Sequence, residues 1–84
     1  MYLDIYFDVE NDDVDEFIED VKEELKEVKK DDVIVVIDLV IETDINKYKN
    51  FYKEIPVDRD FEANKDEVIE LIKNEIKEIK NGKQ

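Results

Sequence analysis

Residues 33–41, VIVVIDLVI, constrain the fold of this chain more than any other stretch. β-branched side chains dominate the stretch and lie on both parities, so a strand formed here has two largely apolar faces. A strand of that kind belongs in the interior of a sheet. The stretch therefore predicts a central strand with a neighbouring strand on each side.

Two segments with period-2 alternation supply those neighbours. Residues 2–10 alternate apolar side chains with tyrosines and acids, and residues 47–57 alternate in a similar way. The lysines and the single proline, Pro56, of the second segment favour an edge strand, because both discourage pairing with another chain. Residues 57–62, VDRDFE, fit either a short further strand or a loop.

Two other stretches repeat apolar residues at the i, i+3, i+4, i+7 spacing of an amphipathic helix. The first helix is expected over residues 13–30, with Asp13 as its N-cap, Glu16 as the reciprocal partner and two lysines in the last turn. The second is expected to begin at Asn64 as N-cap and to stop at Gly82. The apolar positions are Val14, Phe17, Ile18, Val21, Leu25 and Val28, then Val68, Ile69, Leu71, Ile72, Ile76 and Ile79.

The order strand, helix, strand, strand, helix predicts an α/β (α+β) two-layer sandwich, a single domain over residues 1–84. A helical crossover makes the first two strands parallel, and a short connection makes the last two antiparallel. The expected result is a three-stranded mixed sheet of order 1-2-3 with both helices on one face. The strand side chains expected beneath the helices are Leu3, Ile5, Phe7, Val9, Val33, Val35, Ile37, Leu39, Ile41, Phe51 and Ile55.

All four tyrosines fall on the opposite parity, which this arrangement leaves uncovered. The uncovered face carries Tyr2, Tyr6, Ile34, Val36, Val40, Tyr48 and Tyr52, rimmed by Asp4, Asp8, Asp38, Glu42 and Glu54. Aromatic anchors within a charged rim are typical of a protein-binding surface. Two other interpretations fit the same residues. In one, tyrosine is tolerated on a sheet face that is partly exposed to solvent and binds nothing; in the other, one helix covers each face of the sheet.

The charge of the chain restricts its partners. Twenty-six acids against thirteen bases give a formal net charge of −13, whereas nucleic acid and anionic membranes are bound through Lys and Arg. We therefore expect no direct nucleic-acid or membrane partner. The expected partner is a basic or apolar protein surface, or a second copy of the chain. No apolar run approaches the roughly 20 residues of a membrane span, and we expect a cytoplasmic protein.

Few residues here are suited to catalysis or metal binding. The chain has no His, Cys or Ser and one Thr, so the common nucleophiles and metal ligands are missing. We expect no enzymatic activity, no cofactor and no metal site. Residues Asp8, Glu10, Asp12 and Glu19 have a spacing like that of a calcium loop, but Asp13 occupies the position of the turn glycine, and helix-capping acids explain the pattern better. Asp38 could act as an acid if it were buried; its parity instead places it, partly exposed, on the open face.

The sequence thus favours a small acidic domain that acts, if at all, through protein–protein contact on its tyrosine-bearing sheet face. One alternative is a de novo designed or idealised fold with no biological function, which would be expected to melt above about 90 °C. Another is an acidic mimic of nucleic acid that inhibits a nucleic-acid-binding protein. The lysines interspersed with acids along both helices count against mimicry, because that pattern is typical of a solvated helix.

Overall fold

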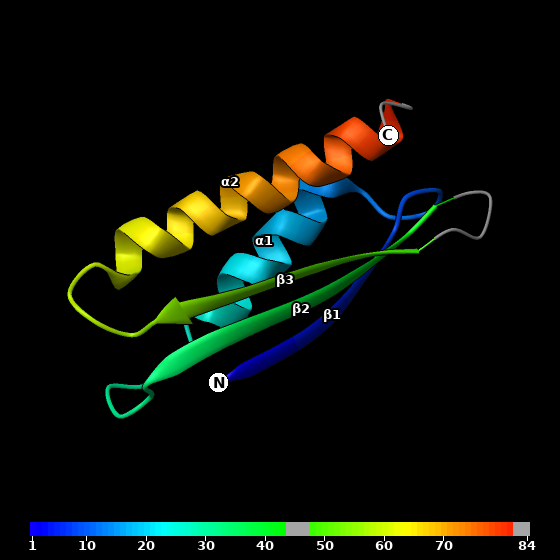
Figure 1. Cartoon of the computed structure of the whole chain (residues 1–84). Helices are drawn as coiled ribbons and strands as arrows, with labels where there is room; N and C mark the ends of the chain where they lie inside the picture. Colours follow the sequence, from blue (N-terminus) through cyan, green and yellow to red (C-terminus); the bar gives the residue numbers. More distant parts are fainter. Residues whose placement is uncertain (44–47, 82–84) are drawn as a thin grey trace.

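The computed structural model describes residues 1–43 and 48–81, and its five elements follow the expected order (Figure 1). The sheet consists of β1 (Tyr2–Asp8), β2 (Ile34–Glu42) and β3 (Tyr48–Pro56), with β2 in the centre. The helices are α1 (Val14–Leu25) and α2 (Phe61–Lys80). Both helices lie on the same side of the sheet (Figure 1), so the predicted two-layer α/β sandwich is confirmed.

The sheet is mixed, with the register that the alternating patterns require. β1 runs parallel to β2, with Tyr2 beside Val36 and Tyr6 beside Val40. β3 runs antiparallel to β2, so that Tyr52 lies opposite Asp38. Because side chains alternate across a strand, this register puts every tyrosine on the side away from the helices.

α1 begins as expected and ends early. The Asp13 side chain accepts a hydrogen bond from the Glu16 backbone N–H at 3.0 Å, which confirms Asp13 as the N-cap. The expected end near residue 30 is wrong, because the helix tightens after Leu25: the backbone N–H of Val28 donates to the Leu25 carbonyl, three residues back. A turn follows in which the Lys29 N–H donates to the Asp32 carboxylate at 2.7 Å.

α2 begins three residues before the predicted Asn64 N-cap. Residues 57–62 form no strand; the chain bends, the Asp60 N–H donates to the Asp58 carboxylate at 2.9 Å, and the helix starts at Phe61. Phe61 is buried and lies about two helical turns ahead of Val68, where the predicted apolar stripe begins, so burial of its ring extends the helix toward its N-terminus. The predicted stop at Gly82 lies outside the described residues.

The core lies between the sheet and the helices. Phe7 at the centre is fully buried and meets Phe17 of α1 edge to face, with the ring centroids 5.0 Å apart. Within residues 1–43 and 48–81 every buried side chain is hydrophobic. The fully enclosed members include Phe7, Val21, Leu25, Val35, Ile37, Leu39, Ile41, Ile55, Ile72 and Ile76.

Among the strand side chains expected beneath the helices, one was wrong and three were only partly right; on α2 the expected apolar stripe was wrong at Leu71, which is 41% exposed. Val33 is 81% exposed, because β2 begins one residue later and Val33 belongs to the connection that precedes it. Ile5, Val9 and Phe51 are half-buried. Ile5 and Phe51 lie on the two outer strands, where the helices cover the sheet less completely, and Val9 lies in the turn that ends β1 after Asp8 instead of at residue 10.

Candidate functional site

The sheet face opposite the helices is open in the described structure. We call it the tyrosine face; it comprises Tyr2, Asp4, Tyr6, Asp8, Ile34, Val36, Asp38, Val40, Glu42, Tyr48, Asn50, Tyr52, Glu54 and Pro56. Its tyrosines are between 50% and 64% exposed, and Val36 and Val40 between them are half-buried. The alternative with one helix on each face is wrong, because both helices cover the other side.

The carboxylate of Asp38 joins all three strands across this face. The Tyr2 hydroxyl donates to Oδ2 of Asp38 at 2.7 Å, and the Asn50 amide donates to Oδ1 at 3.0 Å. Tyr2 reaches Asp38 diagonally, since its direct neighbour on β2 is Val36. Diagonal neighbours in a sheet lie within reach of a tyrosine side chain.

Glu42 repeats the arrangement four residues further along β2. One of its oxygens accepts from the Tyr6 hydroxyl on β1, and the other accepts from the Tyr48 hydroxyl on β3 at 2.8 Å. The Tyr52 hydroxyl donates to Glu54 of its own strand at 2.8 Å. Every tyrosine hydroxyl is thus bound to a carboxylate, which fixes the rings while leaving half or more of each side chain exposed.

These contacts raise the pKa values of the four tyrosines. The hydrogen bond to Asp38 raises the pKa of Tyr2 to about 12, and the hydrogen bond to Glu42 raises that of Tyr6 to about 12. The pKa of Tyr48 and Tyr52 is also raised, first by their hydrogen bonds to Glu42 and Glu54. The ionised phenol is disfavoured because it loses the bond and faces a negative charge.

Asp38 is therefore not a buried acid. It is half-buried, and the hydrogen bonds from Tyr2 and then Asn50 lower its pKa. A carboxylate that accepts two hydrogen bonds is held in its charged form. Its partial exposure agrees with the prediction, and its chemistry is that of a fixed negative charge.

The tyrosine face carries acids and no cations, whereas the helix side of the sheet carries both. The tyrosine face bears five carboxylates, Asp4, Asp8, Asp38, Glu42 and Glu54, and none of its residues is Lys or Arg. Lys49 and Lys53 of β3 have the other parity, and the Lys49 ammonium pairs with Glu75 of α2. Another group of cations lines a hollow of about 430 Å³ on the helix side, namely Lys26, Lys29, Lys30, Arg59 and Lys65.

The residues with calcium-loop spacing serve a different purpose. Asp8 accepts from the Asn11 amide and the Glu10 N–H, which lower its pKa, and Asp12 accepts from the Asp8 N–H. These bonds build the turn between β1 and α1. Within the described ranges no group of three or more acidic side chains is placed to hold a metal ion.

The residue that sequence reasoning missed is Asn50, which shares Asp38 with Tyr2. The sequence did contain a signal for the contacts between tyrosines and carboxylates, since four residues separate Tyr2 from Tyr6 and four separate Asp38 from Glu42. In a parallel pair with fixed register, equal spacing on two strands repeats the same diagonal contact.

Comparison with known proteins gives no further guidance. No protein-family model, curated protein or solved structure matches the chain. None of the helices in the described part of the chain is long and apolar enough to cross a membrane.

Proposed function

We propose that the protein is a non-enzymatic binding module whose tyrosine face docks onto a basic, arginine-bearing protein surface. The observation that carries the proposal is the composition of that face: five carboxylates and four exposed tyrosine rings, with no Lys or Arg among its residues. Arg guanidinium groups pair with carboxylates through two parallel hydrogen bonds and stack on aromatic rings. The face offers both kinds of partner side by side.

Asp38 and Glu42 are the two principal anchor points. They are four residues apart on β2, which corresponds to about 13 Å along a strand. Each is flanked by tyrosines on the outer strands, and Val36 and Val40 provide apolar surface around them. A partner with two guanidinium groups at that separation engages both points without rearrangement of the sheet.

Self-association through this face is the weaker candidate. A two-fold dimer with the faces in contact would bring the carboxylates of one copy against those of the other, and like charges opposed across an interface cost affinity. The tyrosine hydroxyls are already bound within one copy. They are not left needing a donor or acceptor from a second copy.

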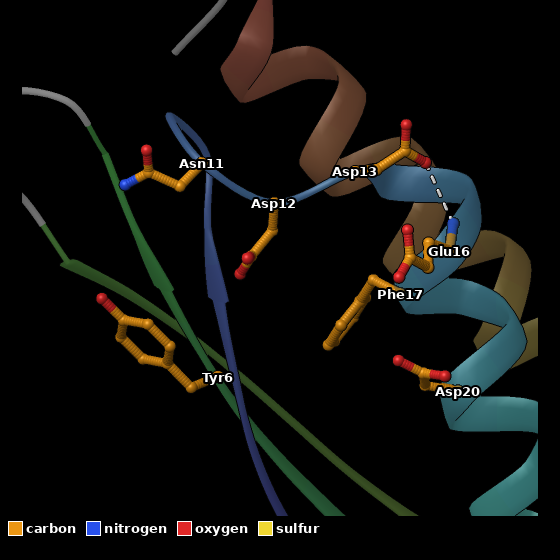
Figure 2. A pocket seen from close by; sticks show the side chains of 7 residues that line it. All are labelled: Tyr6, Asn11, Asp12, Asp13, Glu16, Phe17 and Asp20. Atoms are coloured by element: carbon orange, nitrogen blue, oxygen red, sulfur yellow. Dashed lines mark hydrogen bonds between the residues drawn. The ribbon is translucent and has the colours of Figure 1, made fainter.

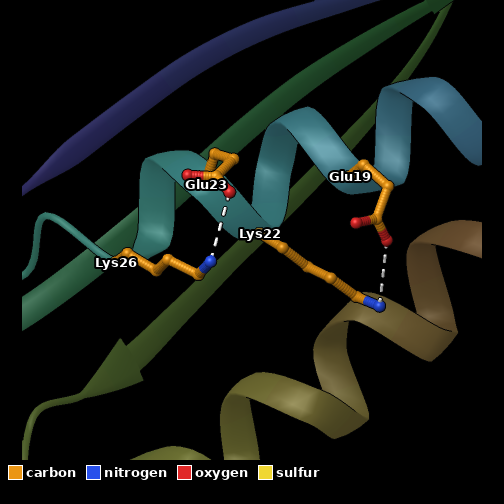
Figure 3. A network of polar contacts seen from close by, with 4 residues as sticks. All are labelled: Glu19, Lys22, Glu23 and Lys26. Atoms are coloured by element: carbon orange, nitrogen blue, oxygen red, sulfur yellow. Dashed lines mark hydrogen bonds and ion pairs between the residues drawn. The ribbon is translucent and has the colours of Figure 1, made fainter.

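Mimicry of nucleic acid is also weaker, because four of the helix acids, Glu19, Glu23, Glu62 and Glu75, are paired with lysines. Along α1, Lys22 lies 3.4 Å from Glu19 and Lys26 lies 3.1 Å from Glu23 (Figure 3). On α2 Lys65 pairs with Glu62 at 2.6 Å. These pairs interrupt the uniform negative potential that a phosphate backbone presents.

Binding of octa-arginine tests the proposal, provided that the general attraction of a −13 protein for a polycation is controlled. The test variant Asp38→Asn/Glu42→Gln removes two charges from the face. The matched variant Glu19→Gln/Glu23→Gln removes two charges from α1. We expect the face variant to weaken octa-arginine binding at least about tenfold and the helix variant at most about twofold, by calorimetric titration at moderate salt.

Two results would overturn the proposal. Equal weakening by both variants would mean that net charge alone attracts the peptide. A wild-type protein that sediments as a dimer, and becomes monomeric in a Tyr6→Glu/Tyr52→Glu variant, would assign the face to self-association. Octa-lysine gives a further check, since it is expected to bind more weakly than octa-arginine if the rings contribute stacking.

A further inference from the structure

The outer edge of β1 adjoins the tyrosine face but offers different atoms, because it presents backbone N–H and C=O groups where the face presents side chains. In a parallel pair, alternate residues direct both backbone groups toward the neighbouring strand. The Met1 carbonyl accepts from Val36 and the Val9 N–H donates to Glu42, each at 2.9 Å. The odd-numbered residues of β1 therefore bond to β2, and the backbone groups of the even-numbered residues face outward.

Only one end of this edge is closed. The Asp8 N–H donates to the Asp12 carboxylate and the Asp8 carbonyl accepts from the Asp12 N–H, both at 2.8 Å. The outward N–H and C=O groups of Tyr2, Asp4 and Tyr6 have no such turn beside them, and in the described chain β1 is an outer strand of the sheet. Three consecutive outward-facing residues remain available for a further strand.

β1 also lacks the devices that protect the other edge. β3 carries Lys49, Lys53 and Pro56, each of which discourages strand pairing. β1 has no lysine and no proline, and its register with β2 is continuous, without a bulge. The two edges of the sheet thus differ: β3 carries residues that discourage strand pairing, whereas β1 does not.

A groove runs beside the open edge, between β1 and α1. One hollow of about 240 Å³ is lined by apolar Leu3, Ile5, Phe17 and Val21, with Asp20 and Glu24 of α1 at its rim. A second, of about 330 Å³, shares Tyr6, Phe17 and Asp20 with it and continues toward Asp12, Asp13 and Glu16. Figure 2 shows the lining of this second hollow, with Tyr6 on one side of β1 and Phe17 on the other.

From this geometry we propose that β1 accepts an added strand: an extended segment of a basic partner chain in which apolar and cationic residues alternate. Its backbone pairs with Tyr2, Asp4 and Tyr6. Its apolar side chains enter the groove over Ile5 and Phe17, and its cationic side chains lie on the other side of the added strand, near Asp4. Neither hollow is lined by Lys or Arg, so the charge favours a basic segment.

A second copy of the chain is a poorer occupant. Antiparallel pairing of β1 with its own copy about Asp4 would set the two Asp4 carboxylates opposite one another, and like charges opposed across strands are destabilising. The segment YLDIYFD has no cation to place near Asp4.

The probe is the peptide acetyl-Lys-Val-Arg-Val-Lys-Val-Arg-amide. Two N-methylated forms are compared with it, each methylated on one alternate set of residues. Strand addition requires that only one of these forms loses binding, because only one set of N–H groups points at β1. We expect at least about a tenfold loss for that form and at most about twofold for the other. Equal behaviour of the two forms overturns the inference.

Asp4 provides the matching change on the protein side. Asp4→Pro removes an outward N–H without breaking a bond to β2, and it is expected to weaken the peptide about tenfold or more. Asp4→Asn keeps the N–H and removes only the charge, so the expected loss is about threefold. Circular dichroism verifies that Asp4→Pro is folded. If this variant does not fold, the comparison of the two N-methylated peptides on the wild-type protein still tests strand addition.

The inference does not depend on the tyrosine face. The Asp38→Asn/Glu42→Gln variant is expected to bind the alternating peptide within about threefold of wild type. Loss of octa-arginine binding with retention of this peptide would support both sites. A loss of this peptide in that variant as large as in Asp4→Pro would overturn the edge site and place the peptide on the tyrosine face.

Discussion

Replacement of Glu42 by glutamine is expected to lower the pKa of Tyr6, and with it that of Tyr48, which donates to the same carboxylate. The raised value in the wild type, about 12, arises first from the hydrogen bond to Glu42, then from desolvation, and then from the Glu42 charge. At pH 11 a tyrosine with a pKa of about 12 is about one tenth ionised, whereas an ordinary tyrosine with a pKa near 10 is about nine tenths ionised. Glutamine carries no charge, and its amide group can donate a hydrogen bond to the ionised phenol, so Tyr6 is expected to be at least about half ionised at pH 11.

The assay is a residue-resolved titration of the tyrosine ring carbons by NMR, with absorbance at 295 nm as a check on the total. Tyr2 is the internal control, because its pKa is raised first by Asp38 and should stay near 12 in the variant. A circular dichroism spectrum at pH 11 verifies that the fold persists. A wild-type Tyr6 that titrates near 10, or an unchanged Tyr6 in the variant, would refute the hydrogen-bond network.

The same shifts fix how stability depends on pH. Tyr2 and Tyr6 have folded-state pKa values above the ordinary 10.0, so their contribution is fully present below pH 10 and is lost as the pH rises toward 12. Asp38 is shifted the other way, below 3.8. Its contribution is present above that pH and is lost as the pH falls below it.

Three further outcomes follow from packing and charge. Phe7→Ala is expected to cost about 3–5 kcal/mol, because the ring is fully buried. Against a total of about 5 kcal/mol this leaves at most about 2 kcal/mol, so the urea midpoint should fall below about half of the wild-type value, and a midpoint near that of wild type would contradict this. Val33→Ala should change the free energy of unfolding by less than about 0.5 kcal/mol, whereas Val35→Ala, at a fully buried position, should cost about 2 kcal/mol; equal costs in urea unfolding would show that the start of β2 is misplaced. Moderate salt should raise the melting temperature by screening the charge of −13, and a flat or falling value in a calorimetric scan would argue against self-repulsion.

The sequence was sufficient for the layer arrangement because its periodicities are clear. The two-sided apolar run of β2 and the two amphipathic stripes leave few ways to build a sheet with helices on one face. Helix ends were less predictable. α1 stops at Leu25 because the Lys29 N–H is taken by Asp32, a side-chain contact that competes with the helix and that propensity alone does not reveal.

The tyrosine face was predictable as a set of residues and not as a network. Parity alone placed Tyr2, Tyr6, Tyr48 and Tyr52 together, as observed. Which carboxylate each hydroxyl binds depends on the diagonal register between strands, and that register follows from three-dimensional packing. The open edge of β1 and the groove beside α1 also required the position of Phe17 relative to the strand.

We propose that the tyrosine face binds basic protein surfaces, and amide chemical-shift changes on the protein as octa-arginine is added at moderate salt map that contact residue by residue. We expect the largest changes on β2 and on Tyr2, Tyr6, Asn50 and Tyr52. The exposed side of α1 around Glu19 and Glu23 should change little. Changes spread evenly over all acidic surfaces, or centred on α1, would contradict the proposal.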